Sequence, residues 1–223
     1  MKLLRACSLF IVLTAVGAAQ AEPASGVSGG EGMPLDIAQR LSMDSVVSGH
    51  FRQSKEQAGL PAPLQSEGWF VFWRGHGVHW ATESPVEQAT IYRNDRTLQS
   101  NGSSGAVREL TGRTERTFRR VLLEVFNLDE TQLGRQFKLQ WQGDAQRWRL
   151  ILRPKTLTLK TALQEVSLSG GESIDTLRIV DAQGLTLQMD FSKQQRSNLP
   201  LDLQRCKALF FYSSEQCQQH PSS

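Results

Sequence analysis

The sequence contains little cysteine, few histidines and almost no excess of one charge. Its 223 residues include three cysteines and four histidines, and 25 basic residues stand against 22 acidic ones. No C-x-x-C pair is present, so a thiol redox role is not expected. The balanced charge gives no basis for the phosphate-tracking surface that nucleic-acid binding needs. The chain also lacks any apolar run of the roughly 20 residues that a membrane-spanning helix requires.

The longest apolar stretch lies at the N-terminus and has the features of an export signal. Lys2 and Arg5 accompany an apolar segment from Ala6 to Val16, and Ala19-Gln20-Ala21 supplies a small-x-small cleavage pattern. We therefore expect residues 1–21 to be removed by cleavage after Ala21 and the mature protein to be exported. An uncleaved anchor is the alternative.

The segment after the signal, residues 22–33, is rich in Gly, Ser and Ala and is interpreted as a flexible leader. Residues 34–223 remain, a length that suits one large β domain, since sandwiches and barrels commonly reach roughly 200 residues as a single unit. Without the signal, the chain has 23 basic and 22 acidic residues, a net charge of +1. We therefore expect one domain after the leader.

Cys206 and Cys217 are the two cysteines of the expected mature chain. In an oxidising compartment, an even pair at this short spacing predicts a disulfide. Closing this loop is expected to stabilise the C-terminal end by about 3 kcal/mol in the chain-entropy model.

Alternation of apolar and polar residues predicts antiparallel strands joined by turns. Helices are predicted at Pro34–Ser42 and Thr114–Asn127, with one more turn at 128–133 that Gly134 would end. A tight turn is expected at Asp181–Gly184, with glycine where a positive φ is needed. The predicted strands cover residues 46–53, 66–74, 78–81, 89–92, 97–100, 137–141, 147–153, 163–168, 174–180 and 185–191.

The segment Gly68–Arg74 is apolar on both faces of its predicted strand. Trp69 and Trp73 point to one side, and Phe70 and Phe72 point to the other. An antiparallel strand with one wet face alternates apolar with polar residues, so both faces of this strand must be covered. The core of the fold is one cover. The other is left open between the helix at 114–127, a neighbouring subunit and an apolar ligand.

The predicted helix at 114–127 carries an apolar stripe on one side and arginines on the other. The stripe consists of Phe118, Val121, Leu122, Val125 and Phe126. Arg116, Arg119 and Arg120 form a polar face, which is interpreted first as a solvated surface. Lipid head groups or an acidic partner are the alternative ligands for these arginines.

No arrangement of catalytic side chains stands out. Gly26–Gly30 matches the G-x-S-x-G nucleophile pattern, but neither a strand precedes it nor a helix follows it. His76 and His79 have a metal-like spacing, yet the turn expected at Gly77 favours a simple polar loop. We therefore expect no enzyme activity, no cofactor and no metal.

Several motifs, in their order along the chain, resemble the periplasmic outer-membrane lipoprotein carrier family (LolA-like). Its members share F-x-Q near the first strand, then G-x-[apolar]-x-[apolar]-x-R-P and F-x-W. This sequence has Phe51-Arg52-Gln53, Gly68 through Arg74, and Val78-His79-Trp80, and continues with Trp148–Pro154 and Ile174–Phe191. The match covers most of the chain after the leader. It is most similar to a divergent branch found with lipid or polyene pathways.

The resemblance implies an α+β fold, in which a strongly curved antiparallel sheet forms an unclosed β-barrel with a helical lid. It implies that acyl chains bind between sheet and lid, and that Arg74 holds the lid closed. Gly75 departs from the family pattern, which has proline after the arginine, so the geometry of this latch is left open. The candidate cavity and lid residues are Trp69, Phe70, Phe72, Trp73, Arg74, Trp80, Phe118, Leu122 and Phe126.

By the same resemblance, the expected protein is a monomeric periplasmic carrier or chaperone. It would shield the acyl chains of lipoproteins, or of a related lipid, and move them from the inner toward the outer membrane. An inner-membrane exporter and an outer-membrane acceptor would be its partners. A lipid-sensing regulatory domain on the same scaffold is the alternative, and a lipid hydrolase is a third hypothesis.

Overall fold

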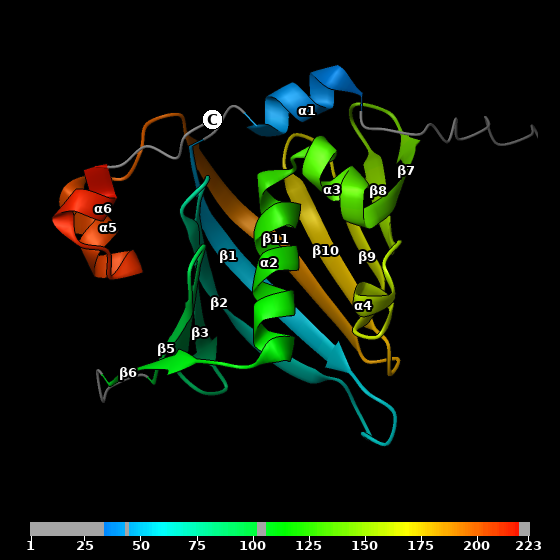
Figure 1. Cartoon of the computed structure of the whole chain (residues 1–223), viewed down its shortest axis with the longest axis horizontal. Helices are drawn as coiled ribbons and strands as arrows, with labels where there is room; N and C mark the ends of the chain where they lie inside the picture. Colours follow the sequence, from blue (N-terminus) through cyan, green and yellow to red (C-terminus); the bar gives the residue numbers. More distant parts are fainter. Residues whose placement is uncertain (1–33, 43–44, 102–105, 219–223) are drawn as a thin grey trace, which may run out of the picture.

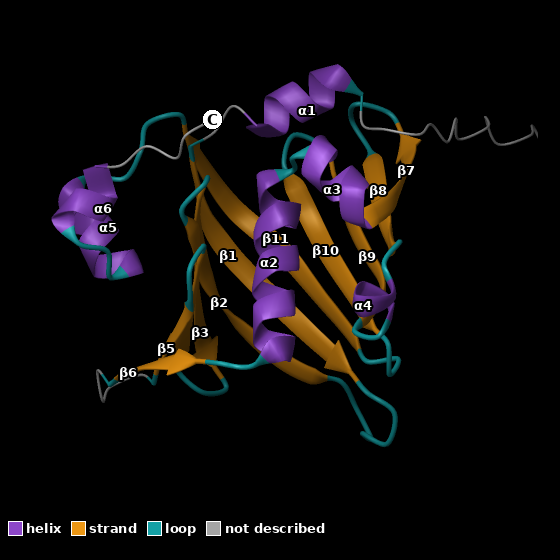
Figure 2. Cartoon of the chain, in the orientation of Figure 1, coloured by secondary structure: helices purple, strands orange, loops and turns teal. Residues whose placement is uncertain are grey.

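The computed structural model describes residues 34–42, 45–101 and 106–218. The expected signal at 1–21 and leader at 22–33 lie outside the described residues. The described part forms one antiparallel sheet with helices on both of its faces (Figures 1 and 2).

The helices are α1 (Leu35–Ser42), α2 (Arg113–Asn127), α3 (Glu130–Gln136), α4 (Leu157–Lys160), α5 (Leu203–Phe210) and α6 (Ser214–Gln218). The strands are β1 (Val46–Glu56), β2 (Leu64–Trp73), β3 (Gly77–Ser84), β4 (Gln88–Arg93), β5 (Thr97–Ser100), β6 (Val107–Leu110), β7 (Phe137–Gly143), β8 (Trp148–Pro154), β9 (Leu163–Gly170), β10 (Ile174–Asp181) and β11 (Thr186–Ser197).

The sheet places its first and last strands side by side at its centre. The strand order is β6-β5-β4-β3-β2-β1-β11-β10-β9-β8-β7. Phe51 of β1 therefore lies opposite Phe191 of β11 on one side and Gly68 of β2 on the other. β6 and β7 are the two edges and do not pair with each other, so the barrel stays unclosed. This architecture confirms the α+β fold that the sequence resemblance implied.

The chain that connects the two edge strands forms α2 and α3, which are part of the helical cover of the sheet. Figure 1 shows α2 lying across the open, concave side, with α1 and α3 near one end of the sheet and α4 beside β9. α2 forms because its apolar residues recur at helical spacing, and these residues are buried against the sheet. None of the helices in the described ranges is long and apolar enough to cross a membrane.

Helix α3 differs from the sequence prediction. It begins after Asp129, whose side chain accepts a hydrogen bond of 3.0 Å from the main-chain N–H of Gln132, as an N-cap does. The helix then continues through Gly134 to Gln136, so the predicted end at Gly134 is wrong. A glycine lowers helix propensity without ending a helix that is capped and packed, and Leu133 anchors this one in the core.

The predicted turn at Asp181–Gly184 is confirmed. Gly184 has φ +85°, and its N–H donates to the main-chain oxygen of Asp181 over 3.2 Å. The sequence prediction omitted β6, α4 and both C-terminal helices. α5 and α6 lie on the convex side of the sheet, away from α2 (Figure 2).

Candidate functional site

Aromatic side chains from four strands line the concave side of the sheet. Phe70 of β2 contacts Phe191 of β11 with ring centroids 5.1 Å apart, and Phe51 of β1 lies 4.2 Å from Trp80 of β3. These residues belong to the main hydrophobic core. Because the side chains of alternate strand residues share a face, Phe72 projects to the same side as Phe70.

Helix α2 covers this aromatic surface with its apolar stripe. Phe126 lies between the two halves of the sheet, with its ring 5.4 Å from Phe72 and 6.0 Å from Phe191. Leu122 is buried in the same core, and the half-buried Phe118 packs against Tyr92 at 5.8 Å. The interior is therefore a layer of large apolar side chains between sheet and helix.

Arg74, directly after β2, joins the sheet to two helices. Its Nη1 donates a hydrogen bond of 2.7 Å to the main-chain oxygen of Asn127, and its Nη2 donates one of 2.6 Å to that of Leu41. Both oxygens belong to the C-terminal ends of helices, α2 and α1, where carbonyl groups lack partners within the helix and a positive charge is favourable. The guanidinium carbon also lies 5.4 Å from the centre of the Phe72 ring. One side chain thus fixes both helices to the sheet.

Gly75 strengthens the same junction. It has φ +72°, a region that suits glycine and that proline cannot adopt because its ring fixes φ near about −65°. The N–H of Gly75, which proline would lack, donates to the side-chain oxygen of Asn127 over 3.2 Å. The main-chain oxygen of Gly75 accepts a bond of 2.6 Å from Asn94. The residue that departs from the family pattern therefore adds a contact between the turn and the end of α2.

The part of the interior next to Arg74 is almost filled in this structure. A cavity of about 40 Å³ lies next to Arg74, between Phe70, Phe72, Phe126 and Phe191. Ligand pockets usually measure roughly 300–1,000 Å³. An acyl chain can enter this part of the interior only if the helices move away from the sheet.

Trp69 and Trp73 lie on the opposite face of β2, outside this interior. Trp73 is only 2% exposed, and its ring lies 3.6 Å from that of His76 and 5.8 Å from that of Phe210 in α5. Trp69 stacks on His79 at 4.8 Å. The second apolar face of this strand is therefore covered by the C-terminal helices of the same chain, a cover that the sequence analysis did not consider.

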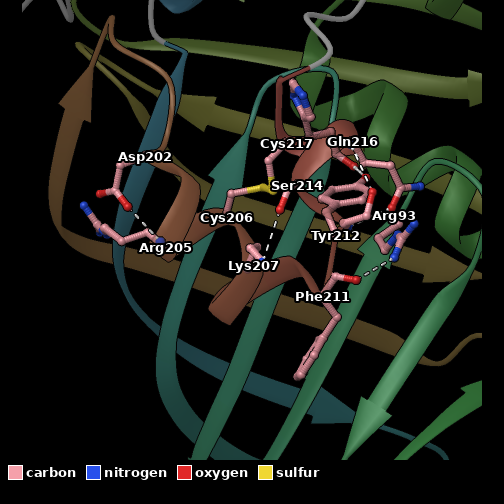
Figure 3. The surroundings of a disulfide bond; sticks show 12 residues. Arg93, Asp202, Arg205, Cys206, Lys207, Phe211, Tyr212, Ser214, Gln216 and Cys217 are labelled. Carbon is pink, nitrogen blue, oxygen red and sulfur yellow. Dashed lines mark hydrogen bonds between the residues drawn. A yellow bond between two sulfur atoms is a disulfide. The ribbon is translucent and has the colours of Figure 1, made fainter.

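A disulfide joins these two C-terminal helices, as the sequence predicted. The sulfur atoms of Cys206 in α5 and Cys217 in α6 are 2.01 Å apart, and Cys206 is fully buried (Figure 3). Asp202 caps α5 by accepting a bond of 2.8 Å from the N–H of Arg205. Arg93 of β4 lies over the Tyr212 ring at 4.0 Å. The disulfide thus closes a small helical unit that packs on β2, β3 and β4.

The two histidines of the turn and β3 have structural partners. His76 lies within 3.0 Å of the main-chain oxygen of Arg74 through Nδ1. Nδ1 of His79 donates to the main-chain oxygen of Leu209 over 2.6 Å, since a carbonyl oxygen only accepts. Burial lowers the pKa of His79, and the bond to Leu209 partly opposes this effect. Both rings therefore help to attach the C-terminal helices.

Burial also affects a tyrosine beneath α2. The pKa of Tyr92 is raised, first because its hydroxyl is removed from water and second because of the negative charge of Glu115. Glu115 also accepts a hydrogen bond from Thr97 of β5. The N-terminal half of α2 is therefore held against β4 by the packing of Phe118 on Tyr92, and against β5 by the hydrogen bond between Thr97 and Glu115.

The structure divides the sequence-predicted candidates into two groups. Those that lie between sheet and α2 are Phe70, Phe72, Trp80, Phe118, Leu122 and Phe126, with Arg74 at the end of the helix. Trp69 and Trp73 lie on the other face. Phe191 and Leu128 also line the interior cavity but were not among the candidates. Alternation along the predicted strand at 185–191 is the signal that could have identified Phe191.

A comparison with protein-family models matched residues 43–203 to the family described as outer membrane lipoprotein carrier protein LolA. Among solved structures, a DUF1329 family protein from Desulfovibrio piger is similar, with 12% identity and a TM-score of 0.42 over 78% of this chain and 96% of that one. A LolA superfamily protein from Nitrosomonas europaea has 10% identity and a TM-score of 0.41, over 74% of this chain and 94% of that one. A comparison with curated protein sequences found no match.

Proposed function

This chain belongs to the outer membrane lipoprotein carrier family, LolA, and from that membership we propose that it is a periplasmic lipid carrier. It shields the acyl chains of lipoproteins, or of a related lipid, between sheet and helices, and moves them from the inner toward the outer membrane. Residues 1–21 direct its export and are removed by cleavage after Ala21. The carrier acts as a monomer between an inner-membrane exporter and an outer-membrane acceptor, and its action requires no catalytic residue or cofactor.

The observation that carries the proposal is the pair of hydrogen bonds from Arg74 to the ends of α1 and α2. These bonds hold two helices over an apolar interior that has little free volume next to Arg74. A carrier needs such a closed form when empty, because an open apolar surface would be exposed to water. It also needs a cover that can be released, and two hydrogen bonds to main-chain oxygens can break without rearranging the sheet.

The energetics suit transfer of an acyl chain. Removing a methylene group from water contributes about 0.8 kcal/mol, so one long chain contributes on the order of 10 kcal/mol. This gain exceeds the cost of breaking a few hydrogen bonds of about 1–3 kcal/mol each. Moving α2 also uncovers its buried apolar stripe, so cargo can open the cover where the acyl chain replaces α2 against the sheet.

The first test is mass spectrometry of the protein purified from the periplasm under mild conditions. The proposal predicts copurified acyl lipid, and displacement of an apolar fluorescent probe by added acyl chains. Copurification of a signalling protein, without lipid transfer between membranes, would instead favour a lipid-sensing regulatory domain on this fold. Turnover of an acyl ester that disappears with a single Ser or His substitution would favour a hydrolase.

A matched pair of variants separates binding from folding. Phe70 and Trp69 are neighbours on β2 whose side chains face opposite sides of the sheet. Phe70→Glu places a carboxylate in the interior and is expected to abolish probe binding, whereas Trp69→Glu places it under α5 and is expected to leave binding intact. Leu122→Glu repeats the interior change on the movable helix. Equal effects of Phe70→Glu and Trp69→Glu on binding, in folded protein, would count against the proposal.

A further inference from the structure

Three arginines form a stripe on the outer side of α2. Arg113, Arg116 and Arg120 are exposed and stand at positions i, i+3 and i+7 of the helix. Within the described part of the chain, Arg113 and Arg116 form no ion pair with a carboxylate, and Arg120 has Glu124 as a charged neighbour one turn further along α2. Burial raises the pKa of Glu124, and the positive charge of Arg120 opposes that rise. Arg119 differs, because it turns toward Glu115, with its Nε 3.6 Å from a carboxylate oxygen, and is largely buried. We call Arg113, Arg116 and Arg120 the arginine stripe.

The arginine stripe does not stabilise the helix that carries it. Like charges three or four positions apart on a helix repel each other. Arg113 and Arg116 also lie in the N-terminal part of α2, where the helix dipole disfavours positive charge. Their side chains are exposed, so packing does not account for them either. An anion bound at the stripe would remove both sources of repulsion.

An open apolar groove lies beside the stripe. It has a volume of about 620 Å³, which falls within the usual range for ligand sites of roughly 300–1,000 Å³. Its walls come from the N-terminal half of α2, from α4 and from the ends of β9 to β11. The apolar lining consists of Phe118, Leu157, Leu163, Ile179, Leu185 and Leu187.

The groove is continuous with both the arginines and the core. Arg113 and Thr117 line the groove and also the polar surface that holds the rest of the stripe. Ile179, at the floor of the groove, belongs to the main hydrophobic core. At the rim, Leu157 of α4 is 81% exposed and extends this apolar surface to the solvent. An apolar surface therefore runs from the outside, past the arginines, toward the interior.

Two carboxylates near the site are occupied by other groups. Asp181 lines the groove, but its Oδ1 accepts hydrogen bonds of 2.9 Å and 2.8 Å from the main-chain N–H groups of Gln183 and Leu185. Glu124 lies beside the stripe, where the side chain of Gln136 donates to it over 2.7 Å. Arg113 and Arg116 therefore remain available to an external anion, and Arg120, which also acts on Glu124, can share its guanidinium with one.

We propose that this groove takes an acyl chain whose anionic head group, a phosphate or a carboxylate, binds Arg113, Arg116 and Arg120. The inference rests on the proposed carrier function and specifies its cargo as an anionic amphiphile. Arginine fits this role because its planar guanidinium donates two parallel hydrogen bonds to one phosphate or carboxylate. The site lies at the N-terminal end of α2, whereas Arg74 holds the C-terminal end. Cargo thus arrives at the end of the cover opposite the latch.

The test compares two ligands that share one chain. Binding of dodecyl phosphate and of dodecanol to the full-length mature protein is measured by displacement of an apolar fluorescent probe, at about 50 mM salt, where charge screening is weak. Dodecyl phosphate is expected to bind about tenfold more tightly than dodecanol, and the difference should shrink as salt is raised. Inorganic phosphate is measured alongside, to separate a lipid site from a site for free anions.

Variants test whether the arginine stripe causes the preference for dodecyl phosphate over dodecanol. Joint replacement of the three arginines, Arg113→Gln with Arg116→Gln and Arg120→Gln, is expected to weaken dodecyl phosphate to the level of dodecanol and to leave dodecanol unchanged. Arg205→Gln, at an exposed arginine of α5 on the other face of the sheet, is the matched control and should change neither. If the triple variant folds poorly, the triple Arg→Lys variant keeps the charge and should retain only part of the preference.

Other outcomes would contradict either the head-group site or the carrier function. Equal binding of both ligands by the natural sequence would refute the head-group site and leave the carrier function standing. Binding of neither ligand would refute the carrier function itself. Inorganic phosphate that competes as strongly as dodecyl phosphate would indicate a site for free anions. Stripe-dependent attachment to anionic vesicles, without preference between the soluble ligands, would indicate a membrane-docking surface.

Discussion

The guanidinium of Arg74 donates a hydrogen bond of 2.7 Å to the main-chain oxygen of Asn127, the last residue of α2. The side chain of the same asparagine accepts from Gly75, so one residue of the helix receives two bonds from one turn of the sheet. A second bond from Arg74 reaches Leu41 in α1. The position of both helices over the interior therefore depends on the turn between β2 and β3.

Replacing Arg74 tests this dependence. Arg74→Ala is expected to lower the free energy of unfolding by about 3 kcal/mol, since hydrogen bonds from a charged group contribute roughly 1.5–3 kcal/mol each. Amide hydrogen exchange should accelerate in α1 and at the end of α2, and an apolar dye should bind more strongly. Arg74→Lys is the control, because a single ammonium group cannot match the guanidinium fork and should restore part of the protection. Unchanged exchange in both helices would show that other contacts hold them.

Gly75 offers a test of the turn itself. Gly75→Pro restores the residue of the family pattern, but proline cannot reach φ +72° and has no N–H for Asn127. We expect a loss of more than about 2 kcal/mol in urea unfolding, whereas Gly75→Ala should lose about 1–2 kcal/mol, the usual cost of a left-handed conformation. A Gly75→Pro protein as stable as the natural one would mean that the turn can refold around proline.

The disulfide is expected to stabilise the C-terminal helices. Replacing Cys206 and Cys217 together by serine should cost about 2–3 kcal/mol, from the entropy of a short closed loop. Loosening of α5 would expose Trp73, which is 2% exposed, so its fluorescence should shift to longer wavelength. Reducing agent should reproduce the effect in the natural sequence and have none on the double variant. No shift under either treatment would show that packing on β2 suffices.

His79 makes stability depend on pH. Burial lowers its pKa in the folded state. Below about pH 6.5, His79 of the unfolded chain therefore binds a proton more readily than His79 of the folded chain. Stability should therefore be full above about pH 6.5 and fall as the pH decreases below it. Urea unfolding at about pH 7.5 and 5.5 should show a smaller difference for His79→Asn than for the natural sequence. His50→Asn, at an exposed histidine of β1, is the control; an equal change in both variants would contradict the assignment to His79.

The sequence predicted local secondary structure well, but it did not predict which face of the sheet lines the interior. The unbroken apolar run between Gly68 and Arg74 correctly predicted covers on both faces of β2, because no polar residue interrupts either face. Which face looks inward depends on the helices that return from distant parts of the chain. Phe72 meets Phe126, and Trp73 meets Phe210, and neither contact leaves a signal within the strand.

The elements and contacts that the sequence did not predict lack a strong period of apolar residues or depend on main-chain atoms. α5 has only eight residues, and its burial is concentrated in Cys206 and Phe210, so its pattern is too short to detect. α4 is shorter still. The oxygens that Arg74 binds are main-chain atoms, which every residue possesses, so only the family resemblance pointed to the latch.

The pairing of β1 with β11 has a consequence for how the chain folds after synthesis. Val46 lies opposite Ser197, so the centre of the sheet joins residues separated by almost the whole domain. Pairs this distant in sequence pay the entropy of closing a long loop before they form, which slows folding. The two halves of the sheet cannot join until β11 has been synthesised, and until then Phe70 and Trp80 lack their contacts with Phe191. Before that moment, the chain itself needs the protection from water that we propose it later gives to lipid.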